Sequence, residues 1–382
     1  MPSTSECGQR PQHTQQLFCN VWGATIGRNT RKKPPAVIVL SAVKLIFCPR
    51  SHPSPSGSSH TGLFVSVQGT ARVLRNSGVN AYVRPVLTRQ DIEKLIVQDL
   101  PTHIVVSALW LPTADLTWLA QTHPHVQFCV LCHSNIAFLQ AEPNAITLLR
   151  EAVDLELSSL GNFQVAANSA NGAAGIADAW ECPSIYLPNL YYLDDTVRVL
   201  RRKWSGGTLR IGAFGAIRPL KNPTASAFAA LAIATTLSTN LEFYMNTSRN
   251  DQGWANRLVP AVEAIFRNLP YAKLIKLPWL GWPDFRRQVR GMHLCLQPSF
   301  TETFNIVSAD AVAEGIPSVV SNVIEWAPPH WKADPDDTEA IARAGRQLLA
   351  DAHAALDGLN SLKAHNATGI ILWHHWLQSK LI

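Results

Sequence analysis

Short apolar runs and longer amphipathic stretches alternate along most of the chain. Runs of about four to eight residues rich in Val, Ile, Leu and Phe predict buried strands, and apolar residues repeating every three or four positions predict helices. Strands are expected at residues 36–43, 81–86, 103–108, 126–132, 163–167, 184–187, 209–214, 241–245, 272–277, 294–297 and 318–321. Helices are expected at 64–77, 91–98, 114–122, 145–155, 196–203, 224–237, 254–268, 285–290, 305–314 and 340–350.

This regular exchange of strand and helix predicts parallel sheets covered by helices on both faces. The pattern restarts after Pro188 and Asn189, so we expect an α/β protein with two doubly wound, Rossmann-like domains facing across a cleft. Ligands of such sheets bind at the carboxyl ends of the strands. The expected divisions are a polar N-terminal extension at 1–35, a first domain at 36–190, a second at 191–360 and a final segment at 361–382.

Composition agrees with a globular chain of two domains. The 382 residues are 47% hydrophobic and 16% charged, which excludes a disordered, collagen-like or coiled-coil chain. No apolar run reaches the roughly 18–20 residues that a membrane helix needs, and residues 1–35 lack the apolar core of a secretory signal. Seven scattered cysteines argue against a disulfide framework. We therefore expect a cytoplasmic protein without an integral membrane span.

Positive charge is concentrated in the middle of the chain. Residues 196–300 hold 15 Lys and Arg against 4 Asp and Glu, whereas residues 1–195 hold 13 of each kind. A segment this basic suits a polyanionic partner such as a nucleotide diphosphate, nucleic acid or a membrane surface. A solvated face that keeps the protein soluble is an equally good explanation for the segment as a whole.

One cysteine cluster has the spacing of a cofactor site. Cys129, Cys132 and His133 spell C-x-x-C-H, the pattern of covalent haem attachment. The pattern lies inside a predicted buried strand of a chain without an export signal, and no second ligand pair has the spacing of a zinc site. We expect neither haem nor zinc at these residues.

The most informative stretch is residues 297–322, QPSFTETFNIVSADAVAEGIPSVVSN. It resembles the donor-binding signature of glycosyltransferase family 4, whose fold is GT-B. In that signature a strand ends in Pro-Ser and is followed by an acidic residue, a second acidic residue eight positions on, and Gly-x-Pro before another strand. Glu302 and Asp310 occupy the acidic positions here, although the family usually has Glu at the second. The strings HSNIAFL, VAANS and YLPNLYY are similar to glycosyltransferases of tailed bacteriophages.

The physical chemistry of this stretch fits a nucleotide-sugar site. The start of the expected helix presents backbone N–H groups at Thr303, Phe304, Asn305 and Ile306, and such a terminus attracts a diphosphate. Asp310, two turns into the helix, can accept hydrogen bonds from a ribose diol. The resemblance places Glu302 beside the sugar ring as a catalytic residue.

Residues 211–223, IGAFGAIRPLKNP, resemble the strand and loop that open the family's donor domain. Gly215 and Lys221 keep the family's spacing, but Ala216 stands where the family usually has Arg, and Arg218 follows two positions later. We expect Arg218 and Lys221 to hold the diphosphate. Two cations there offset the negative charge that develops as the sugar–phosphate bond breaks.

The resemblance implies further site residues. His133 stands where the family often has a His that faces the donor sugar, and a buried structural His is the alternative. Gly57 and Gly62 match the family's glycine-rich turn loosely. Trp279 follows a predicted strand where the family packs the nucleobase, and it either stacks on the base or belongs to the core.

No metal is expected. Residues 334–336 spell D-P-D, a metal motif in a different glycosyltransferase fold, but Asp337 precedes an apolar helix and is better explained as its N-cap. Residues 373–376, WHHW, lack a metal-ligand pattern. In GT-B proteins the last helix often crosses back to the first domain, and the resemblance assigns 361–382 to that helix.

The resemblance thus implies a glycosyltransferase of the hexosyltransferase type, with a nucleotide sugar, UDP-sugar favoured, as co-substrate and no cofactor. It implies retention of anomeric configuration, with the leaving phosphate helping to deprotonate the incoming hydroxyl, and an acceptor bound mainly by the first domain. A sugar-nucleotide epimerase or phosphorylase on the same fold and a non-catalytic DNA-binding protein are the alternatives from other classes.

The acceptor is open between several classes. The phage-like strings and the basic middle segment favour a 5-hydroxymethylpyrimidine such as 5-hydroxymethylcytosine in phage DNA, in which case the protein works in the host cytoplasm. A duplex acceptor requires the base to be flipped out of the stack. A saccharide or lipid in envelope polysaccharide synthesis is the next alternative, followed by a small molecule or a protein.

Overall fold

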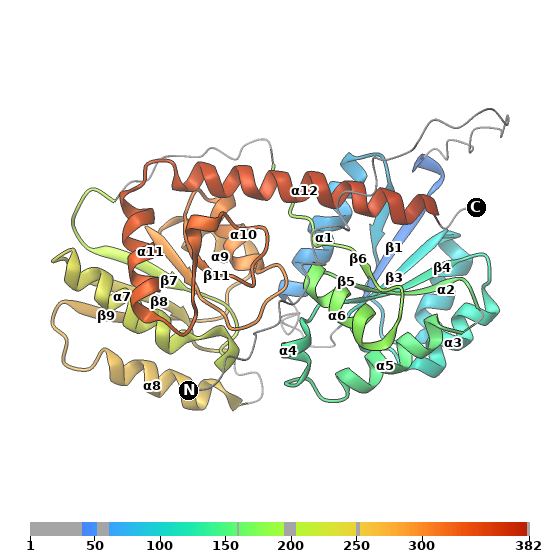
Figure 1. Cartoon of the computed structure of the whole chain (residues 1–382), viewed down its shortest axis with the longest axis horizontal. Helices are drawn as coiled ribbons and strands as arrows, with labels where there is room; N and C mark the ends of the chain where they lie inside the picture. The colour runs from blue at the N-terminus through green and yellow to red at the C-terminus, as the bar shows by residue number, and fades with distance from the viewer. Residues whose placement is uncertain (1–39, 52–60, 159, 195–203, 250–252, 380–382) are drawn as a thin grey trace, which may run out of the picture. The chain divides into compact units, whose positions relative to one another are not determined.

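The computed structural model describes residues 40–51, 61–158, 160–194, 204–249 and 253–379. The expected polar extension, Gly57 and the expected helix at 196–203 lie outside these residues. The described elements belong to the unit that spans Ile38–Ile382. This unit contains two parallel β-sheets, each with its own helices (Figure 1).

The first sheet has six parallel strands in the order β2-β1-β3-β4-β5-β6. Its strands are β1 Lys44–Pro49, β2 Asn80–Val83, β3 His103–Ser107, β4 Gln127–Cys132, β5 Phe163–Ala167 and β6 Ile185–Tyr186. Its helices are α1 Thr61–Asn76, α2 Arg89–Asp99, α3 Thr113–Thr122, α4 Ile136–Leu139, α5 Ala145–Glu156 and α6 Ala170–Trp180. Every residue of β3 and β5 is buried, because helices cover both faces of the sheet.

The second sheet also has six parallel strands, in the order β12-β11-β10-β7-β8-β9. Its strands are β7 Leu209–Ala213, β8 Leu241–Asn246, β9 Ala272–Leu277, β10 Leu294–Gln297, β11 Ser318–Ser321 and β12 Lys332–Ala333. The helices are α7 Pro223–Thr236, α8 Ala255–Ile265, α9 Trp282–Arg290, α10 Ile306–Ala313, α11 Thr338–Ala350 and α12 Ala354–Ser379. Short 3-10 turns lie at Pro219–Lys221 and Pro329–Trp331, and another, Leu40–Ala42, precedes the first sheet.

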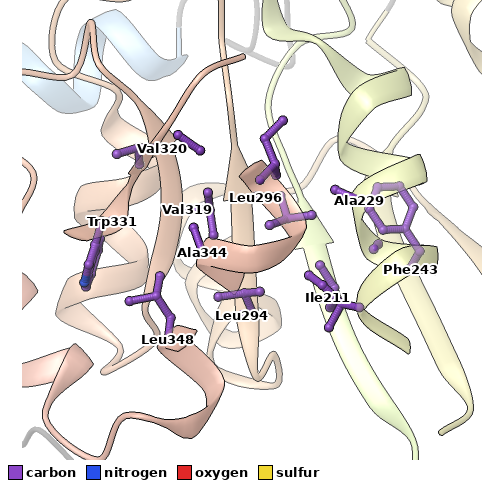
Figure 2. Close-up of a cluster of buried hydrophobic side chains, with 14 of the residues drawn as sticks. Ile211, Ala229, Phe243, Leu294, Leu296, Val319, Val320, Trp331, Ala344 and Leu348 are labelled. Carbon is purple, nitrogen blue, oxygen red and sulfur yellow. The ribbon is translucent and has the colours of Figure 1, made fainter. Parts of the chain in front are cut away.

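The core of the second sheet is built from both strand and helix residues (Figure 2). Ile211 of β7, Phe243 of β8 and Leu294 of β10 are fully buried, and Leu348 of α11 packs in the same cluster. Gly345 lets α11 approach closely, because a Cβ there would overlap Ile233 of α7. This packing holds the loops at the carboxyl ends of β7, β8 and β10 in fixed positions.

The predicted strand at 36–43 is wrong in its described part. Leu40–Ala42 form a 3-10 turn closed by a bond from Val43 N to Leu40 O, and the first strand is Lys44–Pro49. Residues 36–48 form one long apolar run, so hydrophobicity alone could not set the start of the strand. The pairing of Leu45 with both Ala81 and His103 sets it instead.

Helices α4 and α6 were not predicted, and α12 begins earlier than the expected helix at 361–382. Helix α6 is rich in Ala and Gly, so its apolar periodicity is weak, but Ser169 caps it by accepting a bond from Gly172 N. Helix α12 runs from the half that holds α11 towards β1 and β4 (Figure 1). It ends in the first core, where Trp373 contacts Phe47 at 5.4 Å between ring centroids and donates to Pro188 O.

The two cysteines of the C-x-x-C-H pattern lie on opposite faces of β4. Cys129 packs in the cluster that contains Phe47 and Trp373, and Cys132 packs in the cluster on the other side. Side chains three positions apart in a strand point in opposite directions, so the pair forms no common site. Burial raises the pKa of the Cys132 thiol to about 12.

Among the described residues, no helix combines the length and the apolar character that crossing a membrane requires.

Candidate active site

A cavity of about 620 Å³ lies where loops at the carboxyl ends of both sheets come together. The first sheet contributes residues after β3, β4 and β5, among them Trp110, His133 and Asn168. The second sheet contributes the segments after β7, β8, β9 and β10. Loops at strand ends are where ligands of doubly wound sheets bind, and the volume lies in the range of about 300–1,000 Å³ that small-molecule sites occupy.

Hydrogen bonds join the two halves along the cavity wall. Asn135 Nδ2 donates to the carbonyl oxygen of Glu302 at 3.3 Å. Asn168 Nδ2 donates to Thr303 Oγ1 at 3.1 Å, and that hydroxyl donates to the carbonyl oxygen of His133 at 3.2 Å. The segment 302–303, which carries the motif residues, is therefore positioned by the first half as well as by its own sheet.

Glu302 is the most strongly held carboxylate of the cavity. Its Oε1 atom accepts hydrogen bonds from Lys221 Nζ, from Asn305 Nδ2 at 3.1 Å and from Ser299 Oγ at 3.3 Å. The side chain of Glu302 is 11% exposed and that of Lys221 is 28% exposed. A carboxylate with these donors stays in a fixed orientation at the cavity wall, and the lysine remains accessible to a ligand.

Helix α10 begins beside Glu302. Asn305 caps it in the left-handed backbone region, with φ of 57°, and its Oδ1 atom accepts from Ser308 N at 2.9 Å. Ile306 and Phe304 line the cavity with Thr303, although Phe304 is buried and also packs against Trp326. The N–H groups at the start of this helix favour an anion in the cavity.

The loop after β7 brings two cations to the same cavity. Gly215 has φ of +120°, a conformation that L side chains rarely adopt, and Gly215 N donates to Asn246 Oδ1 at 3.2 Å. Arg218 packs over the ring of Phe138 at 4.9 Å and lines the cavity with Lys221. The predicted phosphate-binding residues therefore line the same cavity as Glu302, and Lys221 contacts Glu302 directly.

Glu142 adds a second carboxyl group to the cavity from the first half. Burial raises its pKa, while a bond from Ser134 Oγ to its Oε2 atom at 3.0 Å and the charge of Arg218 act in the opposite direction. The sequence patterns gave no signal for Glu142.

His133 follows β4 and lines the cavity as a half-buried side chain. Its Nδ1 atom lies 3.4 Å from Asn168 Nδ2. Burial lowers the pKa of the imidazole to about 3, so the ring is neutral at physiological pH. Nε2 is buried and has no hydrogen-bond partner among the residues that the structure describes.

Asp310 lies in the cavity wall but is less open than the sequence suggested. It is 1% exposed, and its Oδ1 atom accepts from Tyr191 Oη at 2.8 Å and from Trp282 Nε1 at 3.0 Å. Burial raises the pKa of this carboxyl to about 7. One carboxyl oxygen of Asp310 is therefore already shared by two protein donors.

The remaining predicted residues are distributed as follows. Trp279 lines the cavity, its backbone N donates to Ser248 Oγ at 2.6 Å, and the guanidinium of Arg249 lies 4.7 Å from its ring. Gly62, in the first turn of α1, also lines the cavity and lies close to Ile306. Gly57 lies outside the described residues.

Several cavity residues had no sequence-based expectation, namely Asn135, Asn168, Trp110, Glu142, Arg249 and Trp282. Trp110, Asn135 and Asn168 stand within three residues of the end of a buried strand. The rule that polar residues at the carboxyl ends of parallel strands form the site would have indicated Asn135 and Asn168. Trp282 opens a helix, and only the tertiary structure brings it to Asp310.

Buried polar atoms without partners gather at this cavity. Within the described residues, five cavity-lining side chains have such atoms: Trp110 Nε1, His133 Nε2, Asn168 Oδ1, Trp279 Nε1 and Thr301 Oγ1. Leaving a buried donor or acceptor unpaired costs about 1–3 kcal/mol each. These atoms are closed off from solvent in the unliganded chain, so a ligand pairs with them only where neighbouring side chains shift.

Groups with metal-ligand potential lie elsewhere. In the described part of the chain, the one cluster of three candidate ligands is His330, Asp351 and Asp357, which does not line the cavity. Asp337 caps α11 by accepting from Ala340 N at 2.9 Å, which confirms its predicted capping role. None of residues 334–336 lines the cavity.

No protein-family model matches the chain, and no curated protein matches it in sequence. Solved structures do match. A UDP-forming α,α-trehalose-phosphate synthase from Burkholderia xenovorans, in complex with glucose-6-phosphate, has a TM-score of 0.61 at 13% identity over 88% of this chain and 100% of that chain. A sucrose-phosphate synthase from Thermosynechococcus elongatus has a TM-score of 0.60 at 14% identity over 88% and 99%.

The N-terminal domain of a Candida albicans trehalose-6-phosphate phosphatase has a TM-score of 0.60 at 11% identity, over 93% of this chain and 99% of that chain. Similarity at this level of identity shows the fold and not the activity. No comparison bears on membership of family 4 or on a bacteriophage source, and both stay predictions. The two parallel six-stranded sheets and these matches together confirm the predicted fold, which is GT-B.

Proposed function

We propose that the protein is a glycosyltransferase that moves a sugar from a nucleotide diphosphate to a hydroxyl acceptor. The observation that carries this proposal is the meeting of Lys221 and Glu302 beside the start of α10, in a cavity large enough for a nucleotide sugar. Arg218 adds a second cation to the same wall. A UDP-sugar is the favoured donor, because structural neighbours bear the name UDP-forming synthase.

Different residues bind the diphosphate and the sugar. Arg218, Lys221 and the N–H groups at the start of α10 bind the diphosphate. When the bond from the anomeric carbon to the phosphate oxygen breaks, its electron pair goes to the phosphate, and these cations stabilise the charge. The acceptor oxygen bonds to the anomeric carbon on the same face and passes its proton to the leaving phosphate, so configuration is retained. Glu302 and His133 orient the sugar.

The nucleoside end requires two adjustments to the unliganded arrangement. In our proposal Trp279 stacks on the base. The guanidinium of Arg249 lies over the Trp279 ring in the unliganded arrangement, so it has to leave the face of the ring that the base occupies. Contact between Asp310 and the ribose requires the carboxyl to share or exchange its bonds with Tyr191 and Trp282.

For the acceptor we propose a saccharide. The first half contributes Arg50, Trp110 and Glu142 to the cavity, which are side chains suited to a polar molecule of modest size. Structural neighbours that are named trehalose-phosphate and sucrose-phosphate synthases agree with this class. Hydroxymethylated DNA remains a prediction. Of the basic middle segment, Lys276, Arg286 and Arg290 are already in ion pairs, and residues 198–203 lie outside the described part.

The test is a turnover assay with a panel of UDP- and GDP-sugars. Each donor is combined in turn with monosaccharides and sugar phosphates, and with DNA containing 5-hydroxymethylcytosine, 5-hydroxymethyluracil or cytosine. Mass spectrometry of the products reports the gain of a hexose or N-acetylhexosamine. We expect one donor to react, and both Glu302→Ala and Lys221→Ala to abolish the gain.

The outcomes separate the classes. Gain on a saccharide supports the proposed acceptor, whereas gain on digested DNA nucleosides replaces it with the DNA acceptor. Conversion of the donor without any acceptor points to an epimerase, and salt-sensitive DNA binding without turnover points to a binding protein.

A further inference from the structure

A short hydrogen-bond network connects His133, Asn168 and Thr303 at the wall of the cavity. Asn168 is 2% exposed, and its Nδ2 atom lies 3.4 Å from His133 Nδ1 and 3.1 Å from Thr303 Oγ1. Thr303 Oγ1 in turn lies 3.2 Å from the carbonyl oxygen of His133. Each half of the cavity supplies part of this network, because Thr303 follows β10 and the other two residues follow β4 and β5.

The network determines which end of the Asn168 amide faces the ring. A carbonyl oxygen only accepts, so the Thr303 hydroxyl must donate its hydrogen to His133 O. Thr303 Oγ1 is then left as an acceptor for its second partner, and Asn168 must present its NH₂ group there. The other N–H of that NH₂ group is available to His133 Nδ1, which must therefore accept.

We propose that Asn168 holds His133 as the neutral tautomer with its proton on Nε2, so that the ring presents an N–H donor to the sugar of the bound nucleotide. Asn168 is thus a positioning residue that acts through His133. The role of the ring in binding the sugar rests on the proposed function, whereas the tautomer does not depend on it.

The surroundings of the ring support this assignment. Nδ1 is occupied by Asn168, while Nε2 is buried without a partner in the described part of the chain. Burial keeps the ring uncharged, because it lowers the pKa of His133 to about 3. A neutral ring has one N–H, and a hydroxyl oxygen of a sugar is a suitable acceptor for it. Because Nε2 is closed off from solvent in the unliganded chain, the contact requires side chains beside the ring to shift when the sugar binds.

The tautomer is measured by nitrogen NMR of the full chain labelled at histidine. The two ring nitrogens have different chemical shifts with and without a proton, and the His133→Gln variant identifies which signals belong to residue 133. We expect the wild-type ring to carry its proton on Nε2 alone. A wild-type ring with its proton on Nδ1, or one divided between both tautomers, would overturn the proposal.

Asn168→Asp tests the cause. A carboxylate only accepts, so we expect it to bring a proton to Nδ1 of His133. The matched control is Asn171→Asp, which makes the same change at an exposed position of α6 and should leave the ring unchanged. An Asn168→Asp spectrum with Nδ1 still unprotonated would contradict the proposed role of Asn168.

A binding measurement separates the tautomer from the function. His133→Phe should weaken binding of the reacting UDP-sugar about tenfold or more, because the ring loses the N–H that donates to the sugar. It should leave binding of UDP nearly unchanged, because UDP lacks the transferred sugar and Asn168 still holds Thr303 beside the diphosphate. Equal weakening of both ligands would refute the contact with the sugar. A wild-type protein that binds neither ligand would refute the proposed function and leave the NMR result standing.

Discussion

Two acidic residues of the cavity occupy opposite environments. Glu302 lies against the ammonium of Lys221 and accepts further bonds from Asn305 and Ser299, so its charge is balanced locally. Asp310 accepts from two neutral donors in a fully buried position, so its charge is opposed by desolvation. Glu302 is therefore suited to hold a cation at the cavity wall, and Asp310 is suited to change its protonation.

The cation at Lys221 should account for a large part of the affinity for a nucleotide diphosphate. Lys221→Met removes the charge while keeping most of the apolar stem, and we expect UDP to bind about 10- to 100-fold more weakly, since a charge-assisted bond to phosphate is lost. Calorimetric titration with UDP measures this. Lys276→Met is the control, because Lys276 pairs with Glu263 at 2.7 Å and does not line the cavity. Equal loss in both variants would contradict the assignment.

Asp310 should make stability depend on pH. The pKa of its carboxyl is about 7 in the folded chain against an ordinary value of 3.8, so the folded state keeps a proton that the unfolded state loses as the pH rises from about 4 to 7. The free energy of unfolding therefore falls over that interval, by up to about 4 kcal/mol. The Asp310→Asn variant has no titrating group at position 310, so its stability lacks this dependence on pH.

The pH dependence of stability is checked by thermal unfolding of Asp310→Asn and of the wild type between pH 4 and pH 8. The variant should gain several degrees of Tm relative to the wild type as the pH rises. A difference in Tm that stays constant across the series would show that the buried carboxyl does not titrate in this range.

At the scale of elements, α12 connects the two halves by close packing. It is 26 residues long, and Trp373 and Trp376 near its end donate to Pro188 O and to Gln164 Oε1, both at 2.9 Å. Gly369 lies against the segment between the two sheets, where a Cβ atom would overlap Leu190 and Pro188. The helix can approach this segment only because residue 369 has no side chain.

Two Gly→Ala substitutions in helices should therefore have opposite effects. Gly369→Ala should lower the free energy of unfolding by about 1–3 kcal/mol through overpacking. Gly175→Ala in α6 places its Cβ at 3.7 Å from Ile136, an ordinary contact, and should raise stability by up to about 1 kcal/mol because Ala favours helix. Denaturant titration of both variants measures the sign. Stabilisation by Gly369→Ala would show that α12 is not packed as described.

At the scale of the whole molecule, the cavity depends on side chains from both sheets. Bonds from Asn135 to Glu302 and from Asn168 to Thr303 join the halves at the wall of the cavity. A ligand that fills the cavity contacts both halves and should stabilise them together. UDP at 100 times its Kd should add about 2.7 kcal/mol and raise Tm by a few degrees.

We expect neither UDP binding nor sugar transfer to depend on a metal ion. The carboxyl groups of Glu302 and Asp310 are engaged by protein donors, and the cluster of His330, Asp351 and Asp357 lies outside the cavity. We expect UDP affinity and sugar transfer to be the same after treatment with EDTA as before it. Loss of transfer on EDTA treatment with recovery on adding Mg²⁺ or Mn²⁺ would require a metal in the reaction.

Local sequence patterns were sufficient for elements whose ends are marked by neighbouring polar or turn residues. The strands at 163–167 and 294–297 are short, fully buried and largely apolar runs bounded by polar or turn residues, so hydrophobic burial defined their limits. Their alternation with helices was enough to predict two parallel sheets and a ligand site at the strand ends. Local patterns also identified Asp337 as a helix cap, because capping involves only neighbouring residues.

Features that depend on residues distant in the chain became visible only in the folded structure. It fixed the start of β1 through pairing with β2 and β3, and it turned Asp310 from an open acceptor into a buried carboxyl by bringing Tyr191 and Trp282 to it. It also brought Asn168 between His133 and Thr303. These contacts join residues far apart in the chain, and neutral side chains such as Asn and Trp have no periodic signal that announces a partner.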